Sequence, residues 1–256
     1  MPRSVAFIPA RAGSERVKHK NIQDLAGHPV LAYSVAAARA SGCFEAVIVS
    51  TDSPRYAAIA RHYGAEVPFL RPPEIAGATS PDIEWVQYTL RRLAEEGRAF
   101  ELFSILRPTS PFRQAATIQR AMTQFLAETA GAVDSLRAVE KVRQHPGKMW
   151  VIRGQRLLPL YPFTAPGGAP WHSSQMKALP EIYVQNASLE IAWARVALEQ
   201  GSIAGETILP FLTEGHEGED LNDPEDWFLL NHLIAQGEAA LPHVPEAPYF
   251  GEDVDL

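Results

Sequence analysis

The chain has 256 residues, 46% of them hydrophobic and 21% charged, as in an ordinary globular protein, and its formal net charge of −7 argues against general nucleic-acid binding. Its one cysteine, Cys43, excludes an internal disulfide framework and a multi-cysteine zinc site. No stretch approaches the ~18 uninterrupted apolar residues of a membrane span, and the first apolar run is too short for a signal peptide, so we expect a cytoplasmic protein without a membrane partner.

The first half of the sequence alternates short apolar runs with amphipathic segments. Strands are predicted over 4–10, 45–52 and 101–106, and helices over 28–42, 53–64 and 81–97. The helix at 53–64 has Ser53 at its N-cap position and Pro54 in its first turn, both typical of a helix start. Strands that alternate with helices indicate a Rossmann-like α/β fold, with a mostly parallel sheet covered by helices on both faces.

Polar loops follow the predicted strands at 10–21, at Thr51-Asp52 and at 107–113. Open α/β sheets bind ligands beyond the carboxyl ends of their strands, so we expect these loops to meet at one edge. The last loop contains Arg107 and Arg113, and one of the two is expected to face the site.

The first of these loops is basic although the chain is acidic. It contains Arg11, Arg16, Lys18 and Lys20 but only one glycine, Gly13. The pattern is neither a Walker loop nor a dinucleotide-binding fingerprint, because both need further glycines. A solvated basic turn is one interpretation; a phosphate site is the other, and the position of Arg11 directly after a strand favours it.

The composition of the sequence changes between residues 141 and 182, where proline is frequent. Prolines and the Gly167-Gly168 pair interrupt any helix there, and apolar residues at 149–152 indicate a short hairpin. A strand at 188–194 and a helix at 224–237 then follow. We therefore divide the chain into an α/β domain, residues 1–140 with 183–256, and an inserted arm, residues 141–182, directed toward a partner subunit.

An acidic turn precedes the last predicted helix. Asp223 is explained as the helix N-cap, and Glu225 and Asp226 lie where the helix dipole favours negative charge. Asp220 has no such explanation. With the side-chain oxygen of Asn222 it could hold Mg²⁺ or Mn²⁺, hard cations that share oxygen ligands with substrate phosphates.

Seven short segments are distributed over the whole chain: IPARAGS (8–14), STD (50–52), LRP (70–72), PTSPFR (108–113), HPGKMW (145–150), YVQNAS (183–188) and DLNDPEDW (220–227). Taken in order, these segments resemble the acylneuraminate cytidylyltransferase family, which contains the CMP-sialic acid synthetases and bacterial relatives acting on other nonulosonic acids. The Lys20-Asn21 pair places the chain nearer this branch than the related synthetases for the sugar acid KDO.

The resemblance implies a fold of the nucleotide-diphospho-sugar transferase type and a reaction in which CTP and a sugar acid give the CMP-sugar and pyrophosphate. It also implies that the inserted arm, residues 141–182, joins the subunits of a homodimer or of a tetramer, so that Lys148 would serve the partner's site. The residue roles it implies are catalysis for Arg11, Lys20 and Asp220; nucleotide binding for Arg11, Ser14, Lys20, Asn21 and Arg71; sugar binding for Arg107, Lys148, Gln175 and Asn186; and metal binding for Asp220 and Asn222.

Some positions depart from the family pattern. Asn222 stands where an aspartate is usual, Arg107 where a glutamine is usual, and Ser173 where an arginine is usual. Two alternatives therefore stay open: a nucleotidyltransferase for a different sugar or small acid, and a nucleotide-binding module that has lost catalysis.

Overall fold

The computed structural model describes residues 2–13, 16–128 and 131–249. The chain divides into two compact units, Met1–Ala138 with Asn186–Leu256, and Val139–Gln185. Across the described ranges, no helix is both long and apolar enough to cross a membrane.

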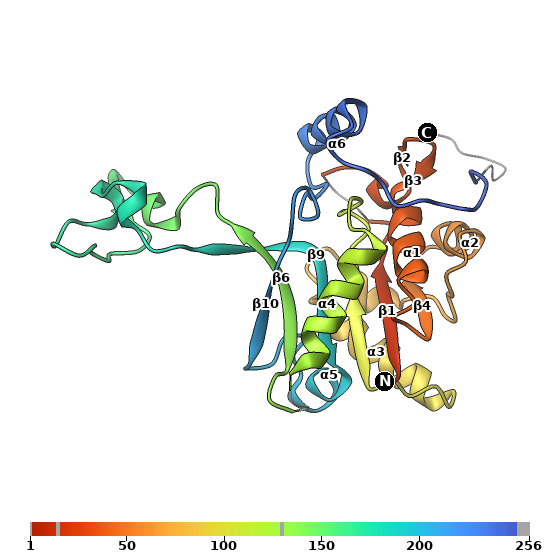
Figure 1. Ribbon diagram of the computed structural model, residues 1–256. Helices are drawn as coiled ribbons and strands as arrows, with labels where there is room; N and C mark the ends of the chain where they lie inside the picture. The colour runs from red at the N-terminus through yellow and green to blue at the C-terminus, as the bar shows by residue number, and fades with distance from the viewer. Residues whose placement is uncertain (1, 14–15, 129–130, 250–256) are drawn as a thin grey trace. The chain divides into compact units, whose positions relative to one another are not determined.

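The larger unit is built on a six-stranded sheet in the order β10-β6-β9-β5-β1-β4 (Figure 1). β1 pairs in parallel with both β4 and β5, whereas β9 runs antiparallel to β5, so the sheet is mixed and mostly parallel. The strands are β1 (Ser4–Pro9), β4 (Ala46–Ser50), β5 (Leu102–Ile105), β6 (Ser135–Lys141), β9 (Tyr183–Trp193) and β10 (Ile208–Leu212). A separate two-stranded hairpin joins β2 (Asp24–Leu25) to β3 (His28–Pro29).

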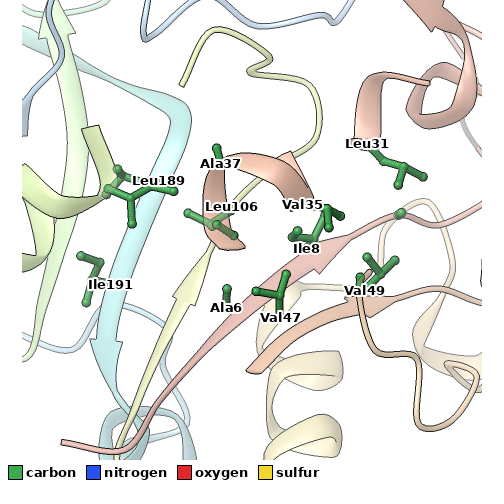
Figure 2. Close-up of a cluster of buried hydrophobic side chains, with 14 of the residues drawn as sticks. Ala6, Ile8, Leu31, Val35, Ala37, Val47, Val49, Leu106, Leu189 and Ile191 are labelled. Atoms are coloured by element: carbon green, nitrogen blue, oxygen red, sulfur yellow. The ribbon is translucent and has the colours of Figure 1, made fainter. Parts of the chain in front are cut away.

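Helices cover both faces of the sheet, which confirms the predicted fold class. Ala6 and Ile8 of β1 point into the same buried cluster as residues of α1 (Figure 2). The cluster also contains residues of α2 and α4. Val5 and Phe7 point the other way, into a cluster with residues of α3 and α5. Because β1 is buried on both sides, it reads as a continuous apolar run. The helices are α1 (Val30–Ser41), α2 (Pro54–His62), α3 (Asp82–Glu95), α4 (Ala115–Ala127), α5 (Ala194–Gln200) and α6 (Pro224–Gln236).

Local signals place most helix ends where the sequence predicts them. Ser53 caps α2 by accepting a hydrogen bond from the backbone N of Tyr56 at 3.3 Å, and Gly42 ends α1 with φ of 64°. The prediction is incomplete elsewhere, because it omits α4, β6, α5 and β10. It also starts the late strand at Ser188, whereas β9 begins at Tyr183.

The smaller unit holds the predicted hairpin. β7 (Trp150–Arg153) pairs antiparallel with β8 (Arg156–Pro159), and short 3₁₀ segments lie at Pro146–Lys148, Trp171–Ser173 and Met176–Ala178. Ring contacts join Trp171 to His145 and to Phe163. Many large apolar side chains of this unit are nevertheless exposed, and they include Ile152, Leu157, Phe163 and Met176.

Candidate active site

A pocket of about 580 Å³ lies at the carboxyl ends of β1 and β5, within the larger unit. Pro9, the last residue of β1, lines it together with the basic loop, and Arg107 to Thr109 line it just after β5. The predicted convergence of the first and third polar loops is therefore confirmed. The other lining residues are Arg11, Arg16, Val17, Lys20, Asn21, Arg71, Gly77, Ala78, Ser80, Asp82, Trp85, Asp220 and Asn222.

Short-range contacts fix the basic loop. Asp52, just beyond β4, accepts a hydrogen bond from the backbone N of Ala12 at 2.8 Å, so the second predicted loop supports the first. Asn21 is buried and donates from Nδ2 to the carbonyl oxygen of Arg11 at 3.4 Å. Arg11 donates to the carbonyl oxygen of Gly13 at 2.8 Å. Side chains and loop geometry, rather than repeated glycines, shape this loop.

Lys20 lines the pocket close to two other cations, Arg16 and Arg11. Burial lowers its pKa; Asp220 opposes that effect, and the neighbouring guanidinium groups of Arg16 and Arg11 add to it. Its ammonium donates to the carbonyl oxygen of Leu221 at 3.0 Å. Three cations, Lys20, Arg16 and Arg11, lie here against the carboxylates of Asp220 and Asp223, so positive charge is in excess and the region is suited to phosphate groups.

Arg71 forms a second, more buried cationic wall. Its guanidinium lies 4.8 Å from the ring centroid of Trp85, and its Nε donates to Ser50 Oγ at 3.1 Å. Burial lowers the pKa of Arg71 to about 10, although the Asp52 and Asp82 carboxylates oppose that shift. A guanidinium fixed against an indole gives a flat, rigid surface to this side of the pocket.

Arg107 reaches the pocket in ion pairs with two carboxylates. Its Nη2 lies 2.5 Å from Asp82 Oδ2 and 3.2 Å from Glu190 Oε1. Burial alone would lower the pKa of Arg107, but the two carboxylates raise it on balance. The same arginine lowers the pKa of Asp82 against the opposing effect of burial.

The acidic turn has the chemistry of a partial metal site. Asp220 Oδ1 is buried and has no hydrogen-bond partner among the described residues, and such an oxygen fits a hard cation. Asp220 Oδ2 accepts from Asn222 Nδ2 at 2.5 Å, while Asn222 Oδ1 accepts from Arg16 Nη2 at 3.3 Å. Asn222 therefore turns its nitrogen toward Asp220, and its oxygen would join a metal only after the amide rotates. The described ranges contain no group of three His, Cys, Asp or Glu side chains suited to a metal, so substrate oxygens and water would supply the other ligands.

The remaining predicted residues lie elsewhere. Ser14 is outside the described residues. Lys148 and Gln175 belong to the smaller unit, where the Lys148 ammonium donates to the carbonyl oxygens of His172 and Ser174. Asn186, in the larger unit, donates to Thr213 Oγ1 at 2.9 Å and is not among the pocket-lining residues.

Of the two arginines at the third loop, Arg107 faces the pocket and Arg113 does not. Arg113 is buried and donates to Ser34 Oγ at 2.6 Å and to the carbonyl oxygen of Ser188. Burial lowers its pKa to about 9 despite the opposing charge of Asp220. Arg113 therefore has a structural role: it links the third loop to α1 and to β9.

Sequence reasoning missed Arg16, Asp82 and Glu190 as parts of the site. Arg16 is one of several basic residues in the first loop and has no distinguishing signal. Asp82 falls in the first turn of the helix predicted over 81–97, where an acidic residue is common, so nothing in the sequence marks it as part of a site. Glu190 carried a usable signal, because a charge in the middle of the apolar run 188–194 has to be paired when that strand is buried.

Comparisons with known proteins agree with this geometry. A family model described as "Cytidylyltransferase" matches residues 5–147. The chain is 35% identical over 240 residues to the CMP-N,N'-diacetyllegionaminic acid synthase of Legionella pneumophila, covering 93% of this chain and 99% of that protein. It is 42% identical over 118 residues to the N-acylneuraminate cytidylyltransferase of Escherichia coli, covering 46% of this chain and 27% of that protein.

A solved structure extends the likeness to the fold. A CMP:2-keto-3-deoxy-manno-octonic acid synthetase complexed with CTP matches with a TM-score of 0.65, over 92% of this chain and 99% of that one. The two sequences are 12% identical, so this likeness bears on the architecture alone.

Proposed function

This chain belongs to the cytidylyltransferase family, and we propose that it activates a nonulosonic sugar acid with CTP, releasing pyrophosphate. The observation that carries the proposal is the pocket in which Arg11, Arg16 and Lys20 gather beside the carboxylate of Asp220. A triphosphate needs such a cationic wall, and a metal bound to a triphosphate needs such a carboxylate.

In the proposed reaction, the anomeric hydroxyl of the sugar acid attacks the α-phosphorus of CTP. A new O–P bond forms, the bond to the β-phosphate bridging oxygen breaks, and the hydroxyl proton passes to solvent. No covalent enzyme intermediate is needed, so catalysis comes from alignment and from neutralising the charge of the leaving pyrophosphate. Arg11, Ser14 and Lys20 would hold the triphosphate, while Asn21 and Arg71 would hold the cytidine.

Mg²⁺, or Mn²⁺ in its place, would be held by Asp220 Oδ1 and the rotated amide of Asn222. A divalent cation there would neutralise charge on the phosphates as pyrophosphate leaves. Asp220 fits that role because its Oδ1 atom is buried and has no hydrogen-bond partner among the described residues. Its carboxylate also lies close to the ammonium of Lys20, a residue that we assign to the triphosphate.

On the sugar side, we assign Arg107 and Asn186 to the acid substrate. From the smaller unit we assign Gln175 to sugar binding as well, and Lys148 to the sugar acid in the site of a partner subunit. We also propose that the smaller unit is the arm of a homodimer. Its many exposed large apolar side chains, including Ile152 and Phe163, support that role, since such side chains are more favourable when a partner covers them.

A direct assay supplies CTP, Mg²⁺ and a panel of N-acylated nonulosonic acids that includes N,N'-diacetyllegionaminic acid and N-acetylneuraminic acid, and measures pyrophosphate. We expect release with at least one acid. Arg11→Ala and Asp220→Ala should each abolish it while the circular dichroism spectrum stays native. Absence of pyrophosphate with every acid, from folded wild-type protein, would overturn the proposal, and tight CTP binding without turnover would point to a binding module.

A further inference from the structure

Arg107 is held by carboxylates from two different elements. Asp82 lies at the start of α3, and Glu190 lies in β9 directly across from Ile105 of β5. Glu190 is also paired on its other side, with Arg137 Nη2 at 3.1 Å from Glu190 Oε2. The Glu190 side chain is only 5% exposed, and the Arg107 side chain is 28% exposed. The guanidinium is therefore clamped between the sheet and a helix, with part of it open to the pocket.

The clamp uses only one nitrogen of Arg107. Both ion pairs go to Nη2, and no described residue accepts a hydrogen bond from Nε or Nη1. Asp82 is fixed in turn, because its Oδ1 accepts from the indole nitrogen of Trp85 at 2.7 Å. Arg107 lines the pocket, so the donors at Nε and Nη1, which have no acceptor among the described residues, are left for a ligand.

Among the four ion-paired side chains of this cluster the formal charges cancel, and Arg71 acts on Asp82 from outside it. Asp82 and Glu190 carry two formal negative charges, and Arg107 and Arg137 carry two positive ones. A compensated guanidinium attracts a distant anion weakly, yet it still donates hydrogen bonds at contact distance. Around Lys20 the balance differs: three cations, Arg11, Arg16 and Lys20, face two carboxylates, Asp220 and Asp223, which leaves one positive charge in excess.

We propose that Asp82 and Glu190 are positioning residues that turn Arg107 into a charge-compensated donor, which selects an uncharged oxygen of the sugar acid, such as an N-acyl carbonyl. The inference rests on the proposed function, in which Arg107 faces the sugar acid. It adds the class of substituent recognised and the residues that set the recognition.

The first test replaces the donors and keeps the charge. Arg107→Lys retains a cation for Asp82 and Glu190 but loses the outward N–H groups, so the KM for the sugar acid should rise about five- to tenfold. The KM for CTP should stay within about twofold, because the triphosphate wall is unchanged. Arg120→Lys is the matched control: Arg120 also bridges two carboxylates, Glu214 and Glu217, but lies outside the pocket, so neither KM should move.

The second test alters the compensation. Glu190→Gln adds one net positive charge to the cluster, so the KM for CTP should fall a few-fold at low salt. It also weakens the ion pair that positions Arg107 Nη2, so the KM for the sugar acid should rise although that substrate is an anion. Asp82→Asn should move the two constants in the same opposite directions. A purely structural role would raise both together or leave the ratio unchanged, and either result overturns the inference.

The third test concerns the substituent. Wild-type protein should prefer an N-acetylated nonulosonic acid over the corresponding free amine, and Arg107→Lys should lower that preference about fivefold, since only the amide offers an oxygen acceptor. Equal preference in both proteins overturns the inference. These outcomes differ from failure of the proposed function, in which wild type releases no pyrophosphate from any acid.

Discussion

The ammonium of Lys20 donates a hydrogen bond to the carbonyl oxygen of Leu221, 3.0 Å away, and so joins the basic loop to the acidic turn. The backbone N of Leu221 in turn donates to the carbonyl oxygen of Thr109 at 2.8 Å. A single residue between Asp220 and Asn222 thus ties together three segments of the pocket.

Lys20 should make CTP binding sensitive to alkaline pH. Burial lowers its pKa from the ordinary value of 10.5, so the ammonium is lost earlier than that of a free lysine as the pH rises. The KM for CTP should increase over that alkaline range, whereas Lys20→Arg, which stays charged, should give a flatter profile. Initial rates at varied pH check this, and an identical profile in both proteins would contradict it.

The same shift has the opposite sign for stability. Between the lowered folded-state pKa of Lys20 and 10.5, the unfolded chain binds more protons than the folded one, so this residue makes the folded state more stable as the pH rises. Urea unfolding at several alkaline pH values, compared between wild type and Lys20→Met, isolates that contribution. The unfolding free energy of wild type should rise relative to that of Lys20→Met as the pH increases, and a relative fall would contradict the prediction.

Asn222→Asp should make the stability of the folded protein depend more strongly on Mg²⁺. The Asn222 amide donates a hydrogen bond to Asp220 Oδ2 at 2.5 Å. An aspartate at position 222 cannot donate this bond, and its carboxylate would repel that of Asp220. We expect the metal-free variant to lose about 1 kcal/mol of unfolding free energy and to regain it with Mg²⁺. Thermal melts with and without Mg²⁺ measure the effect, and equal Mg²⁺-induced shifts in variant and wild type would refute it.

Asp226→Ala should loosen the acidic turn. Asp226 Oδ2 accepts hydrogen bonds from the backbone N of Asn222 at 2.7 Å and of Asp223 at 2.8 Å, so it supports the start of α6 alongside the predicted cap, Asp223. Its loss should cost about 1–2 kcal/mol in urea unfolding. Asp226→Asn keeps an acceptor oxygen and should cost less; equal losses in the two variants would argue against the hydrogen bonds as the cause.

Ile152→Asp should convert a dimer into a monomer. Ile152 lies in β7 of the smaller unit with 76% of its surface exposed, so a charge there should leave the fold intact and disfavour burial in an interface. Light scattering after size exclusion gives the mass. Phe228→Asp, on α6 and equally 76% exposed, is the control that should leave the mass unchanged. Identical masses for Ile152→Asp and wild type would place the interface elsewhere.

The sequence predicted the sheet edge well because short-range signals determine it. Apolar runs end at Pro9 and before Arg107, and the strand-end rule then places both loops at one edge. Ser53 and Gly42 set helix ends through contacts within a few residues. Such features depend on local geometry, so a single sequence is enough to find them.

The wall around Arg107 could not be predicted in the same way. Asp82, Arg107 and Glu190 are far apart in the chain, and only the register of β5 with β9 brings Ile105 opposite Glu190. Helix α4 was omitted although Ile118, Ala121, Met122 and Phe125 have helical spacing. The orientation of the Asn222 amide depends on Arg16, a contact that spacing alone does not encode.

The contacts of Leu221 also bear on how the protein is made. The cationic loop, Arg71 and Arg107 are all synthesised before residue 108, whereas Asp220 and its turn follow more than a hundred residues later. A nascent chain therefore contains every proposed phosphate-binding side chain before it contains the carboxylate proposed to hold the metal. The hydrogen bonds of Leu221 to Lys20 and Thr109 can form only after this late segment has been synthesised. The proposed catalytic activity would therefore appear only when the chain is almost complete.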